Sequence, residues 1–355
     1  MPTTRATVVR AHDAPGPTLV LRLDHLPHGA LALGGELAWV RRALDGTPYA
    51  GIGKIALYRP GPTLDYRFVQ ALPAGGFDFR AGCGHSLLAC VVADGRPGPV
   101  TVRAVTTGDT VLCEPEPHGD AYTLSFLRAP TAPGTLPTGR PVDLLDGTPV
   151  SVVRYGNPYV FVDARHLRAH ADRDARHLRA QHALDAHRPR AHDDLDRLHT
   201  LRAHAALDAH HSRAPAALDR LLTLRAHAAL DAHHPRAHAD LDRLLTLRAH
   251  AARLLGHPPH SALPKIAAFT RGPAGISVRA LTVGGWHPRL ALTGAAALAA
   301  AGALDGTVVP TVSGPVRTPG GTVTVSTAPD RVRVHHKRAE VLERLELPWR
   351  IHATA

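Results

Sequence analysis

The stretch GIGKIALYRPGPTLDYRFVQALPAGGFDFRAGCGHSLLA, residues 51–89, carries the clearest structural pattern in the chain. Its first half contains two runs of β-strand character, KIALYRP at 54–60 and LDYRFVQAL at 64–72, which meet at a Pro-Gly-Pro turn. A glycine-rich connection then leads into CGHSLLACVVADG at 83–95, whose nearly continuous apolar residues predict a helix. This part of the chain is therefore expected to form a sheet with one very apolar helix.

The second half of the chain repeats this order. Strand-like runs LPKIAAFT at 263–270 and ISVRALTVGG at 276–285 come before an apolar helix that begins near Thr293, and TVTVST at 322–327 follows the helix. Two similar α/β domains are the simplest organisation that this repetition indicates.

We expect the first domain to span residues 1–155 and the second to span 156–330. Residues 338–349, RAEVLERLELPW, have apolar residues at helical spacing. Residues 331–355 are therefore expected to form a C-terminal helix that packs back on the first domain.

A repetitive segment interrupts the second domain at about 165–256. TLRAHAAL occurs at 200–207 and 223–230, and TLRAHAAR follows at 246–253, a period of 23 residues. Units rich in Ala, Leu and Arg with a proline near each break predict stacked or hairpinned helices of fewer than about 20 residues. A poorly ordered insert is the alternative.

The same repeats are histidine-rich, which raises the question of a metal site. No HExxH motif and no Cys/His constellation with metal-ligand spacing occurs in the chain. Duplication of near-identical copies explains the number of histidines, so we expect no metal site.

Composition and charge exclude several classes of protein. The net charge of +11 comes from arginines interleaved with Asp and His, and the aromatic content of 4% is too low for base stacking, so we expect no nucleic-acid partner. Three cysteines without ligand-like spacing indicate a reducing compartment. The longest apolar run, 290–304, is too short to span a bilayer, and the chain opens without a basic-then-apolar leader. These features predict a soluble, cytoplasmic protein without a membrane partner.

Three familiar catalytic motifs are absent. GTPYAGIGKI at 46–55 has Pro48 where a P-loop needs its first glycine, and Ile55 where it needs Ser or Thr. GHSLL at 84–88 lacks the second glycine of a GxSxG nucleophile elbow. No GxGxxG follows a strand, so a dinucleotide cofactor is unsupported.

Lys54 and Cys83 remain as candidates for chemistry. Among 41 lysines and arginines only Lys54, Lys265 and Lys337 are lysines, and a lysine amine, unlike a guanidinium, can be tuned to gain and lose a proton. Cys83 precedes a helix, whose unpaired N–H groups lower a thiol pKa and attract a carboxylate. Thr293 and Gly294 open the other apolar helix in the same way. Two facing helix N-termini would hold a di- or tricarboxylate without a metal. The alternative for Cys83 is an ordinary small core residue.

Residues 51–89 resemble the corresponding segment of the 2-methylaconitate cis-trans isomerase family, which has a diaminopimelate-epimerase-like fold. The shared features are a strand with a catalytic lysine at Lys54, an Asp-Tyr-x-Phe-x-Gln segment at 65–70, and Cys83-Gly84 at the mouth of a helix. Segments 136–145, 156–164 and 263–269, together with GGWHPRLALTGAAALAAAGALDGTVV at 284–309, resemble family segments in the same order. The resemblance implies an α+β fold of two similar domains, each a mostly antiparallel sheet wrapped around a central apolar helix, with the helical repeats as an insert.

The resemblance also implies a function. It predicts a cofactor-independent isomerase that performs an allylic proton shift, cis-trans isomerisation or tautomerisation on a small unsaturated di- or tricarboxylate. Lys54 and Cys83 would be the acid–base pair in the interdomain cleft, because Ala291 stands near the place where epimerases of this fold carry a second cysteine. A homodimer is left open. The residues expected to bind the substrate are Gly84, His85, Ser86, His287, Thr293, Gly294, Gly320 and Gly321.

Two other readings of the sequence remain open. One is a catalytically silent relative that binds a metabolite or a protein, for which Lys54→Ala would leave ligand binding intact. The other is a basic, His-rich surface protein for polyanions or metals, whose binding would depend steeply on salt.

Overall fold

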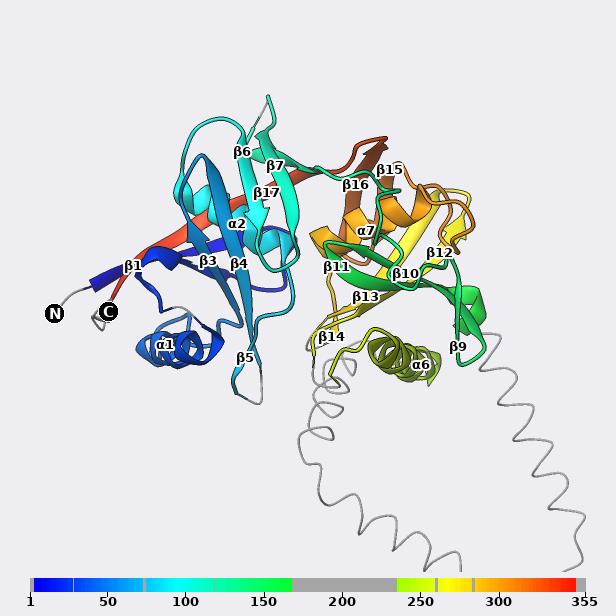
Figure 1. Cartoon of the computed structure of the whole chain (residues 1–355), viewed down its shortest axis with the longest axis horizontal. Helices are drawn as coiled ribbons and strands as arrows, with labels where there is room; N and C mark the ends of the chain where they lie inside the picture. The colour runs from blue at the N-terminus through cyan, green and yellow to red at the C-terminus, as the bar shows by residue number, and fades with distance from the viewer. Residues whose placement is uncertain are drawn as a thin grey trace, which may run out of the picture.

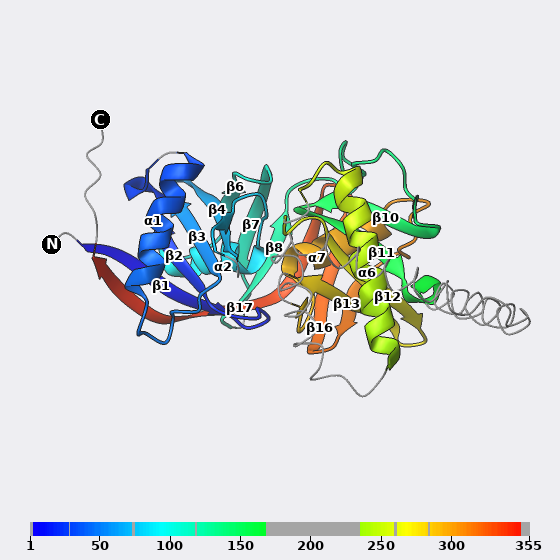
Figure 2. The same cartoon turned by 90° about the horizontal axis from the view of Figure 1, so that it is seen from below.

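The computed structural model describes residues 3–27, 29–72, 75–117, 119–167, 235–258, 261–282 and 285–348. Its strands form two lobes (Figures 1 and 2). The N-terminal lobe comprises β1 (Thr3–Ala11), β2 (Thr18–Arg22), α1 (Ala30–Ala43), β3 (Lys54–Arg59), β4 (Thr63–Ala71), β5 (Phe77–Asp78), α2 (Gly84–Asp94), β6 (Val100–Ala104), β7 (Asp109–Pro115) and β8 (Ala121–Phe126). The C-terminal lobe comprises β9 (Asp143–Leu145), β10 (Thr148–Tyr155), β11 (Asn157–Asp163), α6 (Pro235–Leu254), β12 (Lys265–Gly272), β13 (Gly275–Thr282), β14 (Gly285–Trp286), α7 (Leu292–Gly302), β15 (Gly314–Thr318) and β16 (Gly321–Ala328). A long last strand, β17 (Arg331–Pro348), runs through both lobes (Figure 1).

The two lobes repeat one order of strand pairing. In the N-terminal lobe β2 pairs in parallel with β3 across α1, and β4 pairs in parallel with β6 across α2. In the C-terminal lobe β11 and β12 flank α6, and β13 and β15 flank α7, in the same parallel arrangement. The other pairings of the described strands are antiparallel: hairpins make most of them, and β1 and β8 pair with the distant β17. The expected α+β fold of two similar, mostly antiparallel units is confirmed.

Strand β3 is apolar at successive positions because both of its faces are buried. Ile55 and Leu57 lie in the cluster that contains the buried face of α1, whereas Ala56 lies in the cluster that contains α2. Neighbouring residues of a strand point to opposite faces, so a helix covers each face of this strand. In Figure 1, α1 and α6 lie on the outside of the two lobes, and α2 and α7 lie within them, enclosed by strands of a single sheet that β17 continues from one lobe to the other.

Helices α2 and α7 are the most deeply buried helices that the structure describes. All eleven residues of α7 are buried, as are residues 84–91 of α2. Both helices belong to one hydrophobic cluster that extends through the two lobes. One hydrophobic core therefore continues through both lobes, and each lobe has a further, smaller cluster beneath its outer helix, α1 or α6.

Helix α1 is a correction to the sequence analysis, which expected only one helix in this half. Gly34 and Gly35 lower the intrinsic helix propensity of the segment. Leu33, Leu37 and Val40 nevertheless recur at helical spacing and are buried against β2 and β3. Burial of this face therefore outweighs propensity.

The expected C-terminal helix over 331–355 is wrong within residues 331–348, which form strand β17. The second half of β17 pairs with β1 from Ala11↔Ala339 to Thr3↔Pro348, so this end of the chain does lie against the N-terminal lobe. Backbone hydrogen bonds to β1 override the helical periodicity of RAEVLERLELPW. Residues 349–355 lie outside the described part of the chain.

Strand pairing also bears on the domain boundaries. Strands β10 and β11 form a hairpin in which Tyr155 pairs with Asn157, so a division between 155 and 156 would separate paired strands. We propose to place the division between β8 and β9 instead, at about residues 127–142.

One copy of the 23-residue repeat lies within the described part of the chain. TLRAHAAR at 246–253 lies in α6, whose Leu241, Leu244 and Leu247 are buried. The copies at 200–207 and 223–230 lie outside the described residues. None of the helices described here is long and apolar enough to cross a membrane.

Candidate functional site

A small cavity lies where the two lobes meet. The N-terminal lobe contributes Pro15, Lys54, Phe68, Gln70, Ala81, Cys83 and His85, and the C-terminal lobe contributes Ala262, Lys265, His287 and Ala291. The two residues singled out as an acid–base pair, Lys54 and Cys83, thus line one cavity. Of the expected substrate-binding residues, His85 and His287 line it as well.

The duplicated topology explains why a second lysine lies in the cavity. Lys54 is the first residue of β3 and pairs with Thr18 of β2, and Lys265 is the first residue of β12 and pairs with Tyr159 of β11. The two lysines therefore occupy equivalent positions in the two lobes. The sequence analysis did not include Lys265 in the site, although both lysines precede the same Ile-Ala pair.

Both lysines are held in surroundings that disfavour their charge. Burial lowers the pKa of Lys54 and of Lys265, and the nearby Cys83 thiolate opposes part of that effect. The Nζ atom of Lys54 donates a hydrogen bond to the carbonyl oxygen of Gly16 at 3.3 Å. A lysine whose pKa is lowered can act as a base as well as an acid.

Cys83 is the N-cap of α2 and is partly accessible. Burial by itself raises the pKa of its thiol, but the charges of Lys54 and Lys265 and hydrogen bonds from Ser86 outweigh burial, and the net pKa is lowered. Its carbonyl oxygen accepts a hydrogen bond from the Tyr66 hydroxyl at 2.8 Å. The arrangement favours the thiolate, which is the reactive form of cysteine.

Asn157 of the C-terminal lobe fixes the backbone just before Cys83. Its Oδ1 accepts a hydrogen bond from the Gly82 N–H at 2.7 Å, and its Nδ2 donates to the Gly82 carbonyl at 2.7 Å. Asn157 is completely buried. The sequence analysis missed this role, for which the Gly-Asn-Pro turn between two strands was the only local signal.

The N-termini of the two central helices meet, as the sequence analysis expected. A Cβ on Gly84, the first residue of α2, would lie 2.5 Å from Cδ2 of Leu292, the first residue of α7. Cys83 is the N-cap of α2, and Ala291 is the N-cap of α7. The two N-cap positions are equivalent in the two lobes, but only the one in the N-terminal lobe carries a thiol.

Two histidines from different lobes stack across the cavity. The rings of His85 and His287 are 5.9 Å apart at 16°. Burial lowers the pKa of both, that of His287 to about 3, so both are neutral near pH 7. Nδ1 of His287 accepts a hydrogen bond from the Arg289 N–H at 3.2 Å, which places its proton on Nε2. Nε2 of His85 is buried and has no hydrogen-bond partner among the described residues.

The other expected substrate-binding residues lie outside this cavity. Gly84 and Thr293 line a neighbouring cavity of about 20 Å³, and Ser86 exchanges a hydrogen bond of 3.0 Å with Thr18. Gly294 packs on Tyr159, and Gly320 and Gly321 pack on the loop that carries Arg289. Their close contacts give these residues packing roles, and a role in substrate binding stays a prediction for all six.

The cavity has a volume of about 30 Å³. Ligand pockets usually measure about 300–1,000 Å³, so a dicarboxylate enters only if the lobes or the stacked histidines move. Among the residues that the structure describes, no three His, Cys, Asp or Glu side chains come together as metal ligands.

Two solved structures of isomerases or epimerases have a fold similar to that of this chain. Methylitaconate-delta-isomerase matches 98% of this chain and 95% of its own, with a TM-score of 0.56 and 17% sequence identity. The hydroxyproline epimerase from Agrobacterium vitis, solved with bound trans-4-OH-L-proline, matches 97% of this chain and 92% of its own, with a TM-score of 0.51 and 13% identity. No protein-family model matches the chain, and no curated protein is significantly similar to it. At these identities the likeness is one of fold, and the chain has the two-domain fold of methylitaconate-delta-isomerase, as the resemblance to the 2-methylaconitate isomerase family predicts.

Proposed function

We propose that this protein is a cofactor-independent isomerase of a small unsaturated carboxylate, with Lys54 and Cys83 as its proton-transferring pair. The observation that carries the proposal is the cavity between the lobes, in which an amine and a thiol with lowered pKa values lie together. Perturbed pKa values of this kind cluster at catalytic sites. The fold shared with methylitaconate-delta-isomerase supports the same class of reaction.

The reaction needs one base and one acid, and this pair can supply both. In the ion-paired form the Cys83 thiolate removes a proton from an allylic carbon, and the electron pair delocalises into the carboxylate as a dienolate. The Lys54 ammonium then returns a proton at the other end of the allylic system, so protons and charge balance. The reverse assignment, with Lys54 as base, is equally balanced. In both cases the lowered pKa values of the amine and the thiol lie closer to neutrality, which favours proton transfer by a general acid and base.

Other groups in the cavity are suited to the substrate's negative charge. Lys265 lies beside Cys83, and the Nε2–H of His287 and the unpartnered Nε2 of His85 are available as neutral hydrogen-bonding groups. Donors aimed at a developing enolate stabilise it best when water is excluded. We propose that Lys265 and the two histidines hold the carboxylates while Lys54 and Cys83 move the proton.

The small volume of the cavity favours one second candidate. A catalytically silent relative that binds a metabolite or a protein would not need to admit a dicarboxylate between Lys54 and Cys83. In that protein the stacked His85 and His287 would fill the site permanently. The two candidates differ in whether the thiol and amine exchange protons with a substrate.

Proton NMR in D2O tests the proposal. The purified chain is incubated with aconitate-, itaconate- and mesaconate-type acids, and deuterium at an allylic carbon or a new isomer is the expected result. Lys54→Arg, which keeps the charge but cannot give up its proton, should abolish exchange. Cys83→Ser should reduce it strongly, while Cys113→Ser, which alters a buried cysteine outside the cavity, should leave it unchanged. A folded protein that exchanges no acid in the panel would favour the silent relative.

A further inference from the structure

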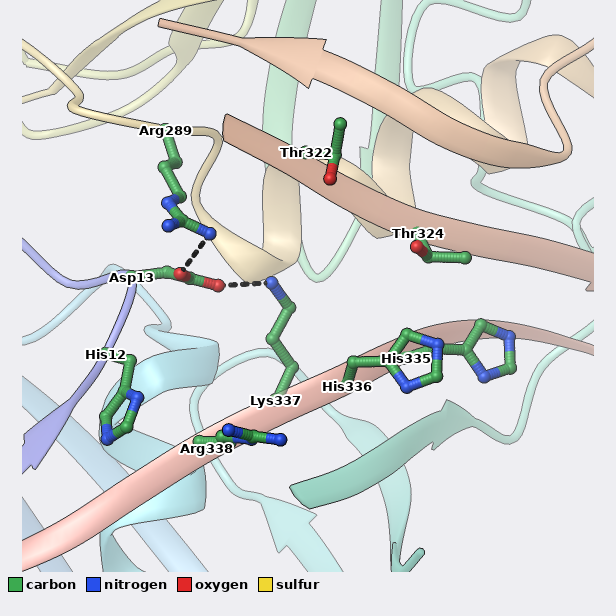
Figure 3. A pocket seen from close by; sticks show the side chains of 9 residues that line it. All are labelled: His12, Asp13, Arg289, Thr322, Thr324, His335, His336, Lys337 and Arg338. Carbon is green, nitrogen blue, oxygen red and sulfur yellow. Dashed lines mark hydrogen bonds and ion pairs between the residues drawn. The ribbon is translucent and has the colours of Figure 1, made fainter. Parts of the chain in front are cut away.

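A second cavity adjoins the first but is lined by different residues. Its volume is about 280 Å³, and it lies between β16, β17 and two loops that also border the candidate active site. The loop after β1 places Pro15 in the first cavity and Asp13 in the second, and the loop after β14 does the same with His287 and Arg289. Figure 3 shows Asp13, Arg289, Thr322, Thr324 and Lys337 around this space.

The charges in this cavity do not balance. The Asp13 carboxylate accepts from Nζ of Lys337 at 2.6 Å and from Nη1 of Arg289 at 2.8 Å (Figure 3). One carboxylate therefore faces two cations, and the group of three carries one net positive charge. The Lys337 side chain is only 3% exposed, so little water reaches it. A buried charge normally has a partner, because an uncompensated charge in surroundings with little water is strongly unfavourable.

Several hydrogen-bond donors in the cavity are also unused. The ammonium group of Lys337 has three donors and gives one to Asp13. The hydroxyl groups of Thr322 and Thr324, which lie on the same face of β16, make no hydrogen bond to any residue that the structure describes. Donors without acceptors beside an excess of positive charge are suited to an anion.

A β-bulge aims Lys337 into the cavity. The pairing of β17 with β8 shifts register between Val334 and Lys337, and His336 there adopts a left-handed φ of 57°. Glu116 holds this turn by accepting from the His336 N–H at 2.9 Å and pairing with its Nδ1 at 2.8 Å. Bulges re-aim side chains, and a strained non-glycine residue persists where the surrounding structure enforces it. Here the bulge buries Val334 and Lys337 on the same side, although they are three residues apart.

We propose that this cavity binds a small oxyanion, the carboxylate or phosphate group of a ligand, between Lys337, Arg289 and the two threonine hydroxyls. A monovalent oxyanion supplies the negative charge that the Asp13, Arg289 and Lys337 group lacks. Its oxygens accept from the two unused ammonium donors and the hydroxyls, and the guanidinium fork of Arg289 matches the spacing of two oxyanion oxygens. The site is distinct from the Lys54 and Cys83 cavity and does not depend on the proposed isomerase activity.

Isothermal titration calorimetry tests the proposal with the full chain, without substrate and at constant ionic strength set with NaCl. Sodium phosphate and sodium acetate are titrated in separate arms, and saturable binding of at least one is expected. Binding of phosphate alone would assign a phosphate group, and binding of acetate would assign a carboxylate. Arg289→Ala should weaken binding by about tenfold or more, the loss expected for a charge-assisted contact.

Matched variants separate the cavity from general charge. Arg333→Ala removes the same charge from β17 outside the lining of the cavity and should leave the affinity unchanged. The double variant Thr322→Val/Thr324→Val keeps every charge and should still weaken binding several-fold, which decides the matter if Arg289→Ala does not fold. Absence of saturable binding in both arms, or equal losses in Arg289→Ala and Arg333→Ala, would overturn the proposal.

Discussion

The reactivity of Cys83 depends on two lysines that come from different lobes. The charges of Lys54 and Lys265 lower the pKa of its thiol against the opposing effect of burial. Because Lys265 belongs to the C-terminal lobe, the thiolate is most favoured when the two lobes are together. The pKa of the Cys83 thiol therefore depends on residues of both lobes.

Replacing Lys265 with Met should raise the pKa of Cys83, because the thiolate loses a nearby positive charge. The rise should slow alkylation of Cys83 several-fold at pH values below the pKa, because less of the thiol is ionised. The rate of iodoacetamide labelling against pH, followed by mass spectrometry, measures this. Lys265→Arg keeps the charge and should behave like the unchanged protein. An identical pH profile in all three proteins would contradict the electrostatic role of Lys265.

Sequence reasoning reached part of this site. The family resemblance singled out Lys54 and Cys83, and the structure brings them to one cavity with His85 and His287. Lys265 was missed because each lysine was judged within its own segment. Its position follows from the duplicated strand order, which is visible in the sequence, but only the pairing of β3 with β2 and of β12 with β11 shows that the two lysines are equivalent.

At the scale of elements, the contact between α2 and α7 is the tightest feature near the site. Gly84→Ala would place a Cβ 2.5 Å from Cδ2 and 2.8 Å from Cβ of Leu292. Because both helices are buried, neither can move away freely. We expect the free energy of unfolding to fall by about 1–3 kcal/mol, the usual cost of overpacking. Urea unfolding followed by circular dichroism measures the change.

Gly35→Ala in α1 is the matched control for this prediction. Gly35 is exposed and a Cβ there meets no atom within 4 Å, so this substitution should stabilise the protein by about 0.5–1 kcal/mol through helix propensity alone. Opposite signs for the two glycines are expected. If Gly84→Ala also stabilised the protein, the close approach of the two helices would be refuted.

The local sequence pattern correctly predicted elements whose own residues determine their secondary structure. It failed for elements whose secondary structure depends on contacts with distant parts of the chain. Helices α2 and α7 begin within one residue of the expected positions, because their apolar residues suit burial on all sides. Strand β17 was mistaken for a helix because its periodicity is helical, while its pairing with β1 lies more than 300 residues away in sequence. Such long-range pairing leaves no trace in a local window.

At the scale of the whole molecule, one core joins the two lobes, and buried basic groups lie along their junction. Burial lowers the pKa of all three lysines and of both cavity histidines. In the folded protein these groups therefore bind fewer protons than in the unfolded chain, and their contribution to stability rises with pH where they titrate. Buried tyrosines and the buried Cys90 and Cys113, whose pKa values burial raises, act in the opposite direction at alkaline pH.

The histidines set the pH dependence in the mildly acidic range. The pKa of His287 is about 3 in the folded protein and about 6.5 in the unfolded chain, so its proton is bound only on unfolding between these values. Lowering the pH from 7 to 5 should therefore decrease the free energy of unfolding by about 2 kcal/mol through His287 alone, with His85 adding in the same direction. Urea unfolding at both pH values measures this loss. His287→Gln should flatten the dependence, whereas His12→Gln, a change at an exposed histidine, should leave it as steep as in the unchanged protein. If the free energy of unfolding depended on pH equally in all three proteins, His287 would not be held neutral between the lobes. Its burial would then no longer support a cavity from which water is excluded.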